Sequence, residues 1–522
     1  MAMATTPTKP RSTYDEVPYL SIPSASTHPS RSAAIASLFG MTPPTVSTAR
    51  ILELGCSTGG NLLPMAEIYP QSTIVGVDLS QEQIHYGTKI IQALGLKNIR
   101  LIRQSIADLG SDIGTFDFII CHGVFSWVPR AVQDKIVEIC ARHLSPNGIA
   151  YIDYNTYPGW HSRGMVREMM KYHVREMADP REQVAEARSF IELLARSALV
   201  AKRGYPSVLE EELGYLAGTP DHYVFHEYLE EENAPLYFHE FVERVMGKGL
   251  QYVADSRLDV LDPEGLPPAV MALLKRCGSD YVRQEQYLDF FSNRAFRRSL
   301  LCHQGISLAG SELHERVDRL HIASTVPPVE LNANAPFPVE LRDPQGRTFR
   351  IADPTMKAIV NYLSKLFPQA VLYGDLEQAL LPRIGPPLGQ NRTQFRRQLL
   401  LGYYQNLFAF FTERPPLPFK IAERPVASPL ARYQATIGDV VSTFHHRALR
   451  LGPLDLEVLK RLDGTRTSGE IIDGLTGRMN RGELPTAIFG GPALGTPGLS
   501  RDSVAQLVAA CLERLRGEGL LR

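Results

Sequence analysis

The chain has 522 residues, more than one ordinary domain holds, and its 44% hydrophobic and 21% charged residues are typical of a soluble globular protein. The formal net charge of -1 argues against a protein whose whole surface binds nucleic acid or anionic lipid. The sequence contains no secretion signal, no close pair among its six cysteines and no run of roughly 18 apolar residues that would span a membrane. We therefore expect a cytoplasmic protein with no membrane insertion and no metal site.

The N-terminal third of the chain has the pattern of a parallel α/β sheet. Residues 1–13 are rich in Thr, Pro, Lys and Ser and are predicted to form a disordered tail, followed by an ordered arm up to about residue 48. We then expect strands at 50–54, 73–77, 99–102, 116–121 and 148–154, and helices at 61–69, 81–94 and 131–143. Strands separated by helices of this length indicate βαβ units, and continuous apolar runs indicate strands buried on both faces.

The remainder is predicted to form a helical insertion, a middle domain and a C-terminal domain. Residues 162–245 are mostly helical, and two late strands are expected at 250–254 and 319–323, with a helical segment at 267–301 between them. Pro-rich linkers are expected at 326–338 and 414–429; strands at 338–341 and 348–351 flank a turn, and helices are expected at 355–366, 454–462, 468–475 and 501–516. The predicted fold class is α/β: a Rossmann-like sheet domain over 14–325 with a helical insertion at about 162–312, a middle α+β domain over 326–429, and a domain over 430–522.

A glycine-containing turn follows the first predicted strand, in the stretch from Ile51 to Asn61 (ILELGCSTGGN). Its glycines, Gly55 and Gly59, allow close approach of the backbone to a ligand, and the helix that follows from Asn61, a further candidate cofactor contact, offers unpaired N–H groups. The dinucleotide fingerprint G-x-G-x-x-G is broken at Ser57. A carboxylate at Glu53 would repel a pyrophosphate but suits the cationic half of S-adenosylmethionine, so we expect this cofactor.

Further candidate cofactor contacts follow the next strands. Asp78 lies 23 residues after Gly55, at the end of the second strand, where it can accept hydrogen bonds from both ribose hydroxyls. Ser105 and Ile106 follow the third strand and offer adenine a polar side chain and an apolar wall. His122 follows the fourth strand and is expected to close the pocket near the methionine end.

Six segments have distinctive sequences: 14–19 (YDEVPY), 27–29 (THP), 154–161 (YNTYPGWH), 233–238 (NAPLYF), 289–294 (DFFSNR) and 462–467 (LDGTRT). They resemble the bacterial protein-lysine methyltransferases typified by the rickettsial enzymes that modify outer membrane protein B, and the loop 53–61 with Asp78 resembles the first two motifs of class I methyltransferases. The resemblance implies that Glu53, Gly55, Gly59 and Asp78 hold S-adenosylmethionine and that Tyr19 and His28 help cover it. It also implies a regulatory region, a winged-helix-like C-terminal domain, a homodimer and a lysine acceptor in a protein. Class I enzymes often carry Asp where this chain has Ser105.

The aromatic segment after the fifth strand is the candidate acceptor site. It contains Tyr154, Tyr157 and Trp160, which would favour a neutral lysine amine by desolvation, and Asn155, which is both donor and acceptor. His161 could relay a proton or cap the next helix. The alternative interpretation is an aromatic loop that packs the insertion onto the sheet.

The sequence contains two further clusters and leaves two other functions open. We expect packing at 237–240 and a solvated surface at His445 and His446. Basic and acidic side chains nearly balance in the C-terminal domain, which favours docking of a protein over nucleic acid. Because the core motifs do not specify the acceptor, a small-molecule (natural product) methyltransferase and a non-catalytic S-adenosylmethionine-binding regulator stay open.

Overall fold

The structure is a computed structural model. It describes residues 17, 19, 21–197, 205–258, 266–309, 312–329, 331, 337–342, 346–384, 388–485, 488 and 500–522. The expected tail at 1–13 and most of the expected turn at 343–346 lie outside the described residues. Within the described part of the chain, no helix is both long and apolar enough to cross a membrane.

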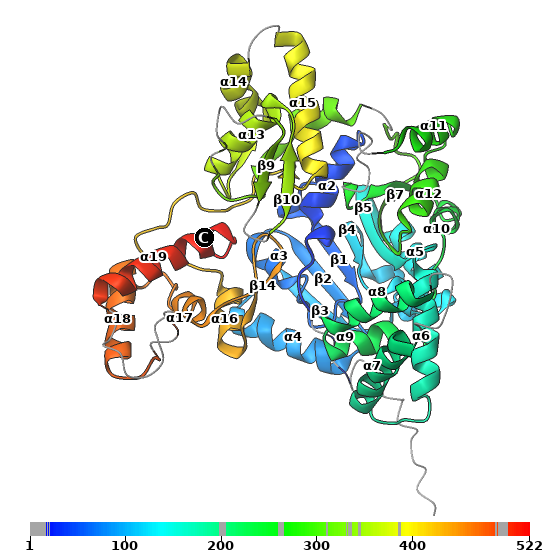
Figure 1. The fold of residues 1–522 in the computed structure, drawn as a ribbon, viewed down its shortest axis with the longest axis horizontal. Coiled ribbons are helices and arrows are strands. Elements are labelled where there is room, and N and C mark those ends of the chain that lie inside the picture. Colours follow the sequence, from blue (N-terminus) through cyan, green and yellow to red (C-terminus); the bar gives the residue numbers. More distant parts are fainter. Residues whose placement is uncertain are drawn as a thin grey trace, which may run out of the picture.

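A seven-stranded sheet forms the centre of the first domain (Figure 1). Its strands, in the order β3-β2-β1-β4-β5-β7-β6, are β3 (Ile99–Arg103), β2 (Thr73–Asp78), β1 (Arg50–Leu54), β4 (Phe116–Cys121), β5 (Leu144–Asn155), β7 (Phe296–His303) and β6 (Leu250–Asp255). The five expected core strands are parallel, and β7 runs antiparallel to both of its neighbours. The strand order reverses between β1 and β4, which is where an open parallel sheet binds its ligand, at the carboxyl ends of the strands.

Helices cover both faces of this sheet, as the alternation of buried side chains requires. On one face, Ile51 of β1 belongs to a core shared with α2 (Pro29–Leu38), α3 (Leu63–Ile68) and α4 (Gln81–Leu94). On the other face, Leu52 and Leu54 pack in a second core with α5 (Arg130–His143) and α10 (Phe238–Met246). Short 3-10 helices connect these elements: η1 (Ala25–Thr27), η2 (Val46–Thr48), η3 (Ile106–Asp108), η4 (Ser111–Ile113) and η5 (Phe125–Trp127).

Both predicted late strands exist, at 250–254 and 319–323, but the helical prediction for 267–301 misses a strand. The segment 267–301 was expected to be helical, but α11 (Pro268–Arg276) and α12 (Tyr281–Ser292) are followed by β7, the strand between β5 and β6. The expected strand at 319–323 is β8 (His321–Ser324), which follows η10 (Leu313–Arg319) and pairs in a different sheet.

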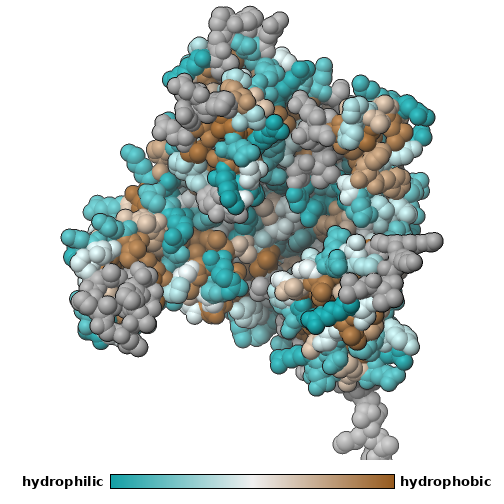
Figure 2. Space-filling model, viewed as in Figure 1, coloured by the Kyte–Doolittle hydropathy of each residue, from teal (hydrophilic) through white to brown (hydrophobic). Residues whose placement is uncertain are grey.

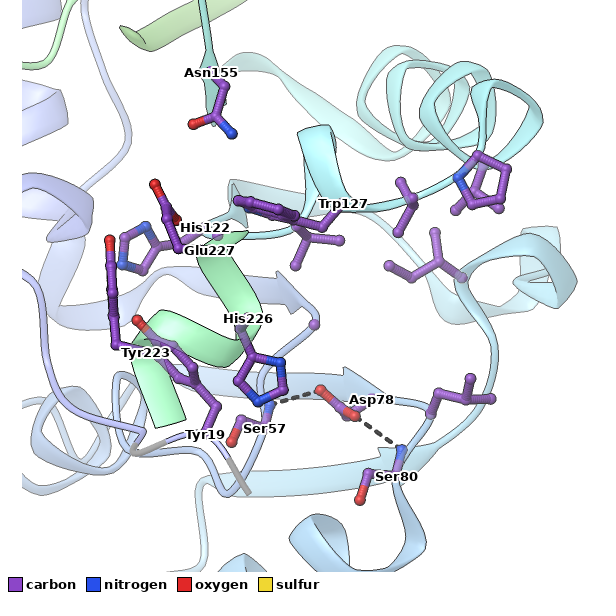
Figure 3. Close-up of a pocket in the computed structure, with 18 of the residues that line it drawn as sticks. Tyr19, Ser57, Asp78, Ser80, His122, Trp127, Asn155, Tyr223, His226 and Glu227 are labelled. Carbon is purple, nitrogen blue, oxygen red and sulfur yellow. Dashed lines mark hydrogen bonds between the residues drawn. The ribbon is translucent and has the colours of Figure 1, made fainter. Parts of the chain in front are cut away.

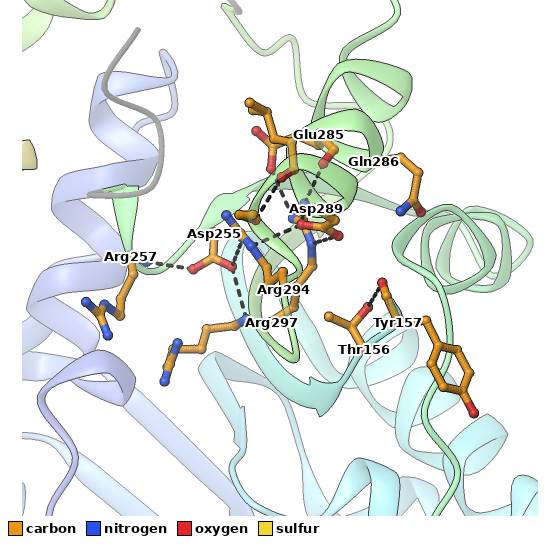
Figure 4. Close-up of polar contacts among 12 residues, drawn as sticks. Thr156, Tyr157, Asp255, Arg257, Glu285, Gln286, Asp289, Arg294 and Arg297 are labelled. Atoms are coloured by element: carbon orange, nitrogen blue, oxygen red, sulfur yellow. Dashed lines mark hydrogen bonds and ion pairs between the residues drawn. The ribbon is translucent and has the colours of Figure 1, made fainter. Parts of the chain in front are cut away.

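The hydrophobic pattern of β7 is interrupted because a charged residue is buried within it (Figure 4). Arg297 is fully buried and binds both oxygens of Asp289 at 2.8 Å and Oε2 of Glu285 at 3.0 Å. Its Nη1 also donates to the hydroxyl of Tyr252 at 3.2 Å. These contacts join β7 to α12 and β6. Because they satisfy the charged group of Arg297, β7 can lie in the core although its sequence contains charged residues.

The insertion forms its own small core beside the carboxyl edge of the sheet (Figure 1). Its helices are α6 (Trp160–Val174), α7 (Pro180–Ser197), α8 (Tyr205–Ala217), α9 (Asp221–Val224) and the π-helix η7 (Phe225–Leu229). Buried side chains that include Val166, Ile191 and Tyr228 hold these helices together.

The middle and C-terminal parts complete the molecule. The middle part has a three-stranded sheet, β11-β8-β12, and a hairpin: β11 (Ala370–Leu372), β12 (Phe408–Phe411), β9 (Val339–Arg342) and β10 (Thr348–Ile351), with α13 (Pro354–Lys365), α14 (Tyr373–Ile384) and α15 (Leu388–Tyr404). The C-terminal part has α16 (Pro429–Ile437), β13 (Val440–Ser442), β14 (Ala448–Arg450), α17 (Pro453–Leu459), α18 (Ser468–Asn480) and α19 (Arg501–Gly517), around a separate core. Figure 2 shows a hollow in the surface where these parts and the insertion meet.

Candidate active site

A cavity of about 710 Å³ lies at the carboxyl ends of the parallel strands (Figure 3). The segments that follow the strands, the N-terminal arm, the insertion and β7 all contribute to its wall. The lining residues are Tyr19, Gly55, Ser57, Asp78, Leu79, Ser80, Gln83, Ser105, Ile106, His122, Gly123, Val124, Trp127, Val128, Pro129, Val132, Asn155, Trp160, Arg163, Tyr223, His226, Glu227, Ala295, Phe296 and Arg298. Six of the predicted cofactor residues are among them: Tyr19, Gly55, Asp78, Ser105, Ile106 and His122.

The turn after β1 can be built only with glycine at its first position. Gly55 has a φ of +76°, and an added Cβ would lie 2.3 Å from Cγ2 of Val124. The N–H groups of Gly55 and Cys56 both donate to the carbonyl of Val77, at 2.8 and 3.0 Å, which fixes the turn to the end of β2. This arrangement leaves the backbone of the turn facing the cavity.

Asp78 ends β2 and organises the same edge of the cavity. Its Oδ2 accepts a hydrogen bond from the N–H of Ser57 at 2.8 Å, and its Oδ1 accepts one from the N–H of Ser80 at 2.9 Å (Figure 3). Beyond it lie the polar Ser105 and the apolar Ile106, with Leu79, Val128 and Val132 completing an apolar wall. A carboxylate next to such a wall suits a ribose and a flat aromatic base.

Glu53 lies behind the glycine turn rather than among the lining residues. It is 2% exposed, its Oε1 accepts from Nδ2 of Asn61 at 2.7 Å, and its Oε2 has no partner among the described residues. Burial raises the pKa of Glu53 to about 7, although Asn61 and His122 oppose the shift. The lining likewise lacks three other predicted cofactor contacts, His28, Gly59 and Asn61. Any influence of Glu53 or Asn61 on a ligand therefore acts through the glycine turn or through the electric field.

Asn61 connects the glycine turn to the arm and to the C-terminal part. Its Oδ1 accepts from the N–H of Ser24 at 3.1 Å, from Oγ1 of Thr27 at 3.0 Å and from Nε2 of His446 at 2.7 Å. The expectation of a solvated surface at His446 is wrong: the residue is 3% exposed, and its ring lies 4.9 Å from that of His28. Burial lowers the pKa of both imidazoles, that of His28 to about 4, so both are neutral donors or acceptors.

His445 also differs from the expectation of a solvated surface. Its Nε2 lies 3.0 Å from the carbonyl oxygen of Gly517, and burial lowers its pKa to about 4. Both histidines therefore belong to the packing of the C-terminal part rather than to its surface.

Sequence analysis missed Asp153, which organises the end of β5. Its Oδ1 accepts from the N–H of Gly123 at 2.7 Å, and its Oδ2 contacts Nδ1 of His122 and accepts from the hydroxyl of Tyr151 at 2.9 Å. Burial favours neutral His122, but the carboxylate of Asp153, and then that of Glu53, outweigh burial and raise the pKa of His122. The sequence does contain a signal for this residue, because Asp153 is an acid within a predicted strand that is otherwise apolar.

The predicted acceptor residues separate into three groups. Asn155 and Trp160 line the cavity, and Trp160 also lines a second cavity of about 390 Å³ together with Tyr157 and His161. The prediction that Tyr154 lines an acceptor channel is wrong, because its ring is buried in the core and stacks on Phe241 at 4.2 Å between centroids.

His161 does not cap the helix that follows, because Gly159 is the N-cap residue of α6. Its ring stacks on Tyr157 at 3.9 Å, and its Nε2 lies 3.2 Å from the hydroxyl of Tyr237. The cluster at 237–240, for which we expect packing, therefore contacts two residues of the second cavity's lining through Tyr237.

The wall opposite the strand ends comes from the insertion and was not predicted. Tyr223, His226 and Glu227 line the cavity, and the ring of Tyr19 lies 6.1 Å from that of Tyr223 and 5.9 Å from that of His226 (Figure 3). Nε2 of His226 lies 2.7 Å from the carbonyl of Val17, which fixes the arm to the insertion. Burial, and then the charge of Glu227, raise the pKa of Tyr19 to about 12.

The polar atoms around the cavity fit a ligand with a cationic end and a hydroxyl-bearing end. Buried polar atoms without a partner among the described residues include Oγ of Ser57 and Nδ2 of Asn155, both of which belong to the lining. The carboxyl groups of Asp78 and Asp153 interact electrostatically with that of Glu53, so three acidic side chains lie around the glycine turn. Among the described residues, no group of three or more His, Cys, Asp or Glu side chains could hold a metal ion.

Comparisons with known proteins agree with this geometry. Three family models match: a methyltransferase domain over residues 51–148, a predicted methyltransferase regulatory domain over 220–303, and a PKMT C-terminal winged helix domain over 423–520. An uncharacterized protein of Rickettsia prowazekii (strain Madrid E) is 36% identical over 481 residues, covering 90% of this chain and 87% of that protein. Another from the same organism is 43% identical over 235 residues, covering 45% of this chain and 94% of that protein. The structure of PKMT2 from Rickettsia typhi in complex with AdoHcy matches with a TM-score of 0.86 and 30% identity, covering 97% of this chain and 100% of that chain.

Proposed function

The chain belongs to the rickettsial-type PKMT family of S-adenosylmethionine-dependent methyltransferases, and we propose that it transfers methyl groups to lysine side chains of a protein acceptor. Its cofactor is S-adenosyl-L-methionine. When bound, this cofactor supplies a methyl group on a sulfonium, which is already a good leaving group. The protein must therefore bind the acceptor amine in its neutral form, orient it and exclude water.

The chain's own residues can be assigned to these tasks by their positions. We assign the ribose to Asp78, the adenine to Ser105 and Ile106, and the amino-acid end to the backbone of the turn at Gly55. His122 is held at the end of β4 by Asp153, so it can orient a group at that end of the cavity without changing its own position.

The observation that carries the proposal is the wall of the cavity beyond the strand ends. There Asn155, Trp160, Tyr223 and Glu227 combine aromatic rings with an amide and a carboxylate. Aromatic faces and a carboxylate bind an alkylammonium ion, and desolvation then favours its neutral amine. A second cavity shares Trp160 with the first, which supports an acceptor that continues beyond its reactive side chain.

The proposal is tested by following the methyl group. The protein is incubated with methyl-labelled S-adenosylmethionine and a bacterial lysate, and labelled proteins are hydrolysed to amino acids. We expect labelled methyl-lysine. Label only in small molecules would indicate a small-molecule methyltransferase, and cofactor binding without any transfer would indicate a regulator.

The remaining parts of the proposal concern assembly and location. We propose a homodimer, which light scattering of the purified protein tests, and a location in the cytoplasm, which fractionation of cells tests. We also propose that the C-terminal domain docks the protein acceptor. Deleting this domain is not a clean test, because His446 contacts Asn61 beside the glycine turn.

A further inference from the structure

A π-helical turn builds the wall of the cavity opposite the strand ends. The π-helix η7 follows α9 directly, and together they place Tyr223, His226 and Glu227 in the lining. The neighbouring residues of the same turn, Phe225 and Tyr228, are buried in the core of the insertion. A π-helical turn is uncommon and frequently occurs at functional sites, because it redirects side chains relative to an α-helix.

The carboxylate of Glu227 lies at the cavity and is only partly neutralised. Its Oε1 accepts from Nη1 of Arg163 at 3.4 Å, a long contact, and its side chain is 12% exposed. Arg163 also contacts Oε1 of Glu212 at 3.3 Å, so one guanidinium serves two carboxylates. The second cation near Glu227 is Arg167, whose Nη2 donates to the backbone carbonyls of residues 230 and 231.

The other groups that face Glu227 are phenols and a second carboxylate. Tyr19, Tyr223 and Tyr228 interact electrostatically with it, from the arm, from α9 and from η7 itself. Burial raises the pKa of Glu227 to about 7; Arg163 and Arg167 oppose this shift, and Glu212 adds to it. Glu227 can therefore take up and release a proton near neutral pH, as a general base must.

We propose that Glu227 receives the ammonium group of the acceptor side chain and accepts the proton that the amine must lose before methyl transfer. This inference rests on the proposed lysine acceptor. Asn155, on the other side of the cavity, has a buried Nδ2 with no partner among the described residues and can orient the acceptor chain (Figure 3).

The proton and electron balance of this step is complete. One N–H bond of the ammonium breaks, and its proton forms an O–H bond with the carboxylate of Glu227. The freed lone pair of the nitrogen forms a bond to the methyl carbon as the bond from that carbon to sulfur breaks, and the electron pair of the broken bond stays on sulfur. The protonated Glu227 then loses its proton to water, and no further reactant is needed.

The variant Glu227→Gln tests the proposal, with Glu227→Asp as the conservative variant and Glu211→Gln, an exposed acid of α8, as the matched charge control. The acceptor is the most strongly labelled lysine-containing protein of the lysate. For Glu227→Gln we expect kcat/KM at pH 7 to fall at least about a hundredfold, as loss of a general base does. The wild-type rate should rise with pH and level off above about 7. The Glu227→Gln variant should keep rising toward the amine's own pKa of about 10.4, because only a free amine can then react.

Three further results decide the outcome. Glu227→Asp should retain the plateau, and Glu211→Gln should match the wild type throughout. The affinity of Glu227→Gln for S-adenosylhomocysteine, measured by calorimetry, should stay within about twofold of the wild type. An unchanged pH profile in Glu227→Gln, or a loss of S-adenosylhomocysteine affinity as large as the loss of rate, would overturn the inference while lysine labelling by the wild type still supports the function. A wild type that labels no lysine would overturn both.

Discussion

Replacing Glu53 by glutamine should make the protein more stable and its cofactor binding weaker. Glu53 is buried, and its pKa is raised from 4.5 to about 7. An acid whose pKa is higher in the folded state stabilises the fold only while it is protonated. Its contribution is therefore fully present below pH 4.5 and is lost as the pH rises through about 7. At about 1.4 kcal/mol for each pKa unit, the loss is about 3 kcal/mol.

The neutral amide introduced by Glu53→Gln avoids this loss because it does not ionise. The oxygen of the new amide can still accept a hydrogen bond from Asn61. Its NH₂ group would replace Oε2 of Glu53, which has no partner among the described residues, and a buried donor without an acceptor costs about 1 kcal/mol. We expect a net gain of about 2 kcal/mol at pH 8, or roughly 3 °C in the melting temperature of a domain of this size, and little or no gain at pH 5. Affinity for S-adenosylmethionine should fall at least tenfold, or about 1.4 kcal/mol, because a negative charge near a cationic ligand is removed.

Thermal unfolding at both pH values and titration calorimetry measure the two effects. Glu67→Gln is the matched control, because Glu67 is also buried but its Oε1 pairs with Arg522 at 2.8 Å, away from the cavity. Glu67→Gln should leave cofactor affinity unchanged, because Glu67 does not line the cavity. The reasoning is refuted if Glu53→Gln melts below the wild type at pH 8, or if the difference between the two proteins is the same at pH 5 and pH 8.

Three other predictions concern the turn, the ribose contact and the buried arginine. Asp78→Asn should weaken binding of S-adenosylhomocysteine at least tenfold by calorimetry, about 1.4 kcal/mol, whereas Asp108→Asn, outside the lining, should not. Gly55→Ala should abolish binding and lower the melting temperature, because its Cβ would meet a valine carbon at 2.3 Å; Gly95→Ala, with positive φ but no neighbour within 4 Å, should cost only about 1 kcal/mol. Arg297→Met should destabilise the fold by about 3–5 kcal/mol in denaturant unfolding, since it leaves the buried carboxylate of Glu285 without its cation and Asp289 with Arg294 alone, and an unchanged midpoint would contradict the network.

Sequence patterns predict the helices and strands whose local hydrophobic pattern agrees with their position in the folded core. The five parallel strands are short segments in which apolar residues predominate, and α4 has the same bounds as its predicted helix at 81–94. The pattern failed at β7 because Arg297 interrupts it, and the charge is tolerated there only through partners on α12 and β6 that lie elsewhere in the sequence. The periodicity of apolar residues reveals which positions are buried only when the buried side chains are apolar. It therefore cannot detect a strand whose buried side chain is charged and held in an ion pair.

The candidate site shows the same division between local and non-local information. Gly55, Asp78 and Ser105 follow predicted strands, so their meeting at one edge follows from parallel pairing alone. Glu227 had no such signal, because its position depends on a π-helical turn and on how a separately packed insertion docks on the sheet.

His446 shows what the C-terminal part adds to a site that is otherwise built from the first domain. It has a φ of +58°, is neutral and buried, and donates to Oδ1 of Asn61, whose Nδ2 in turn donates to Glu53. A neutral donor from a remote domain thus orients the amide that partly offsets the cost of burying the Glu53 carboxylate. If this contact opens, Asn61 keeps acceptor contacts to Ser24 and Thr27 but loses its shortest one, at 2.7 Å. The C-terminal domain therefore contributes to the electrostatics of the glycine turn in addition to any role in docking, and the two contributions are separable by substituting His446 alone.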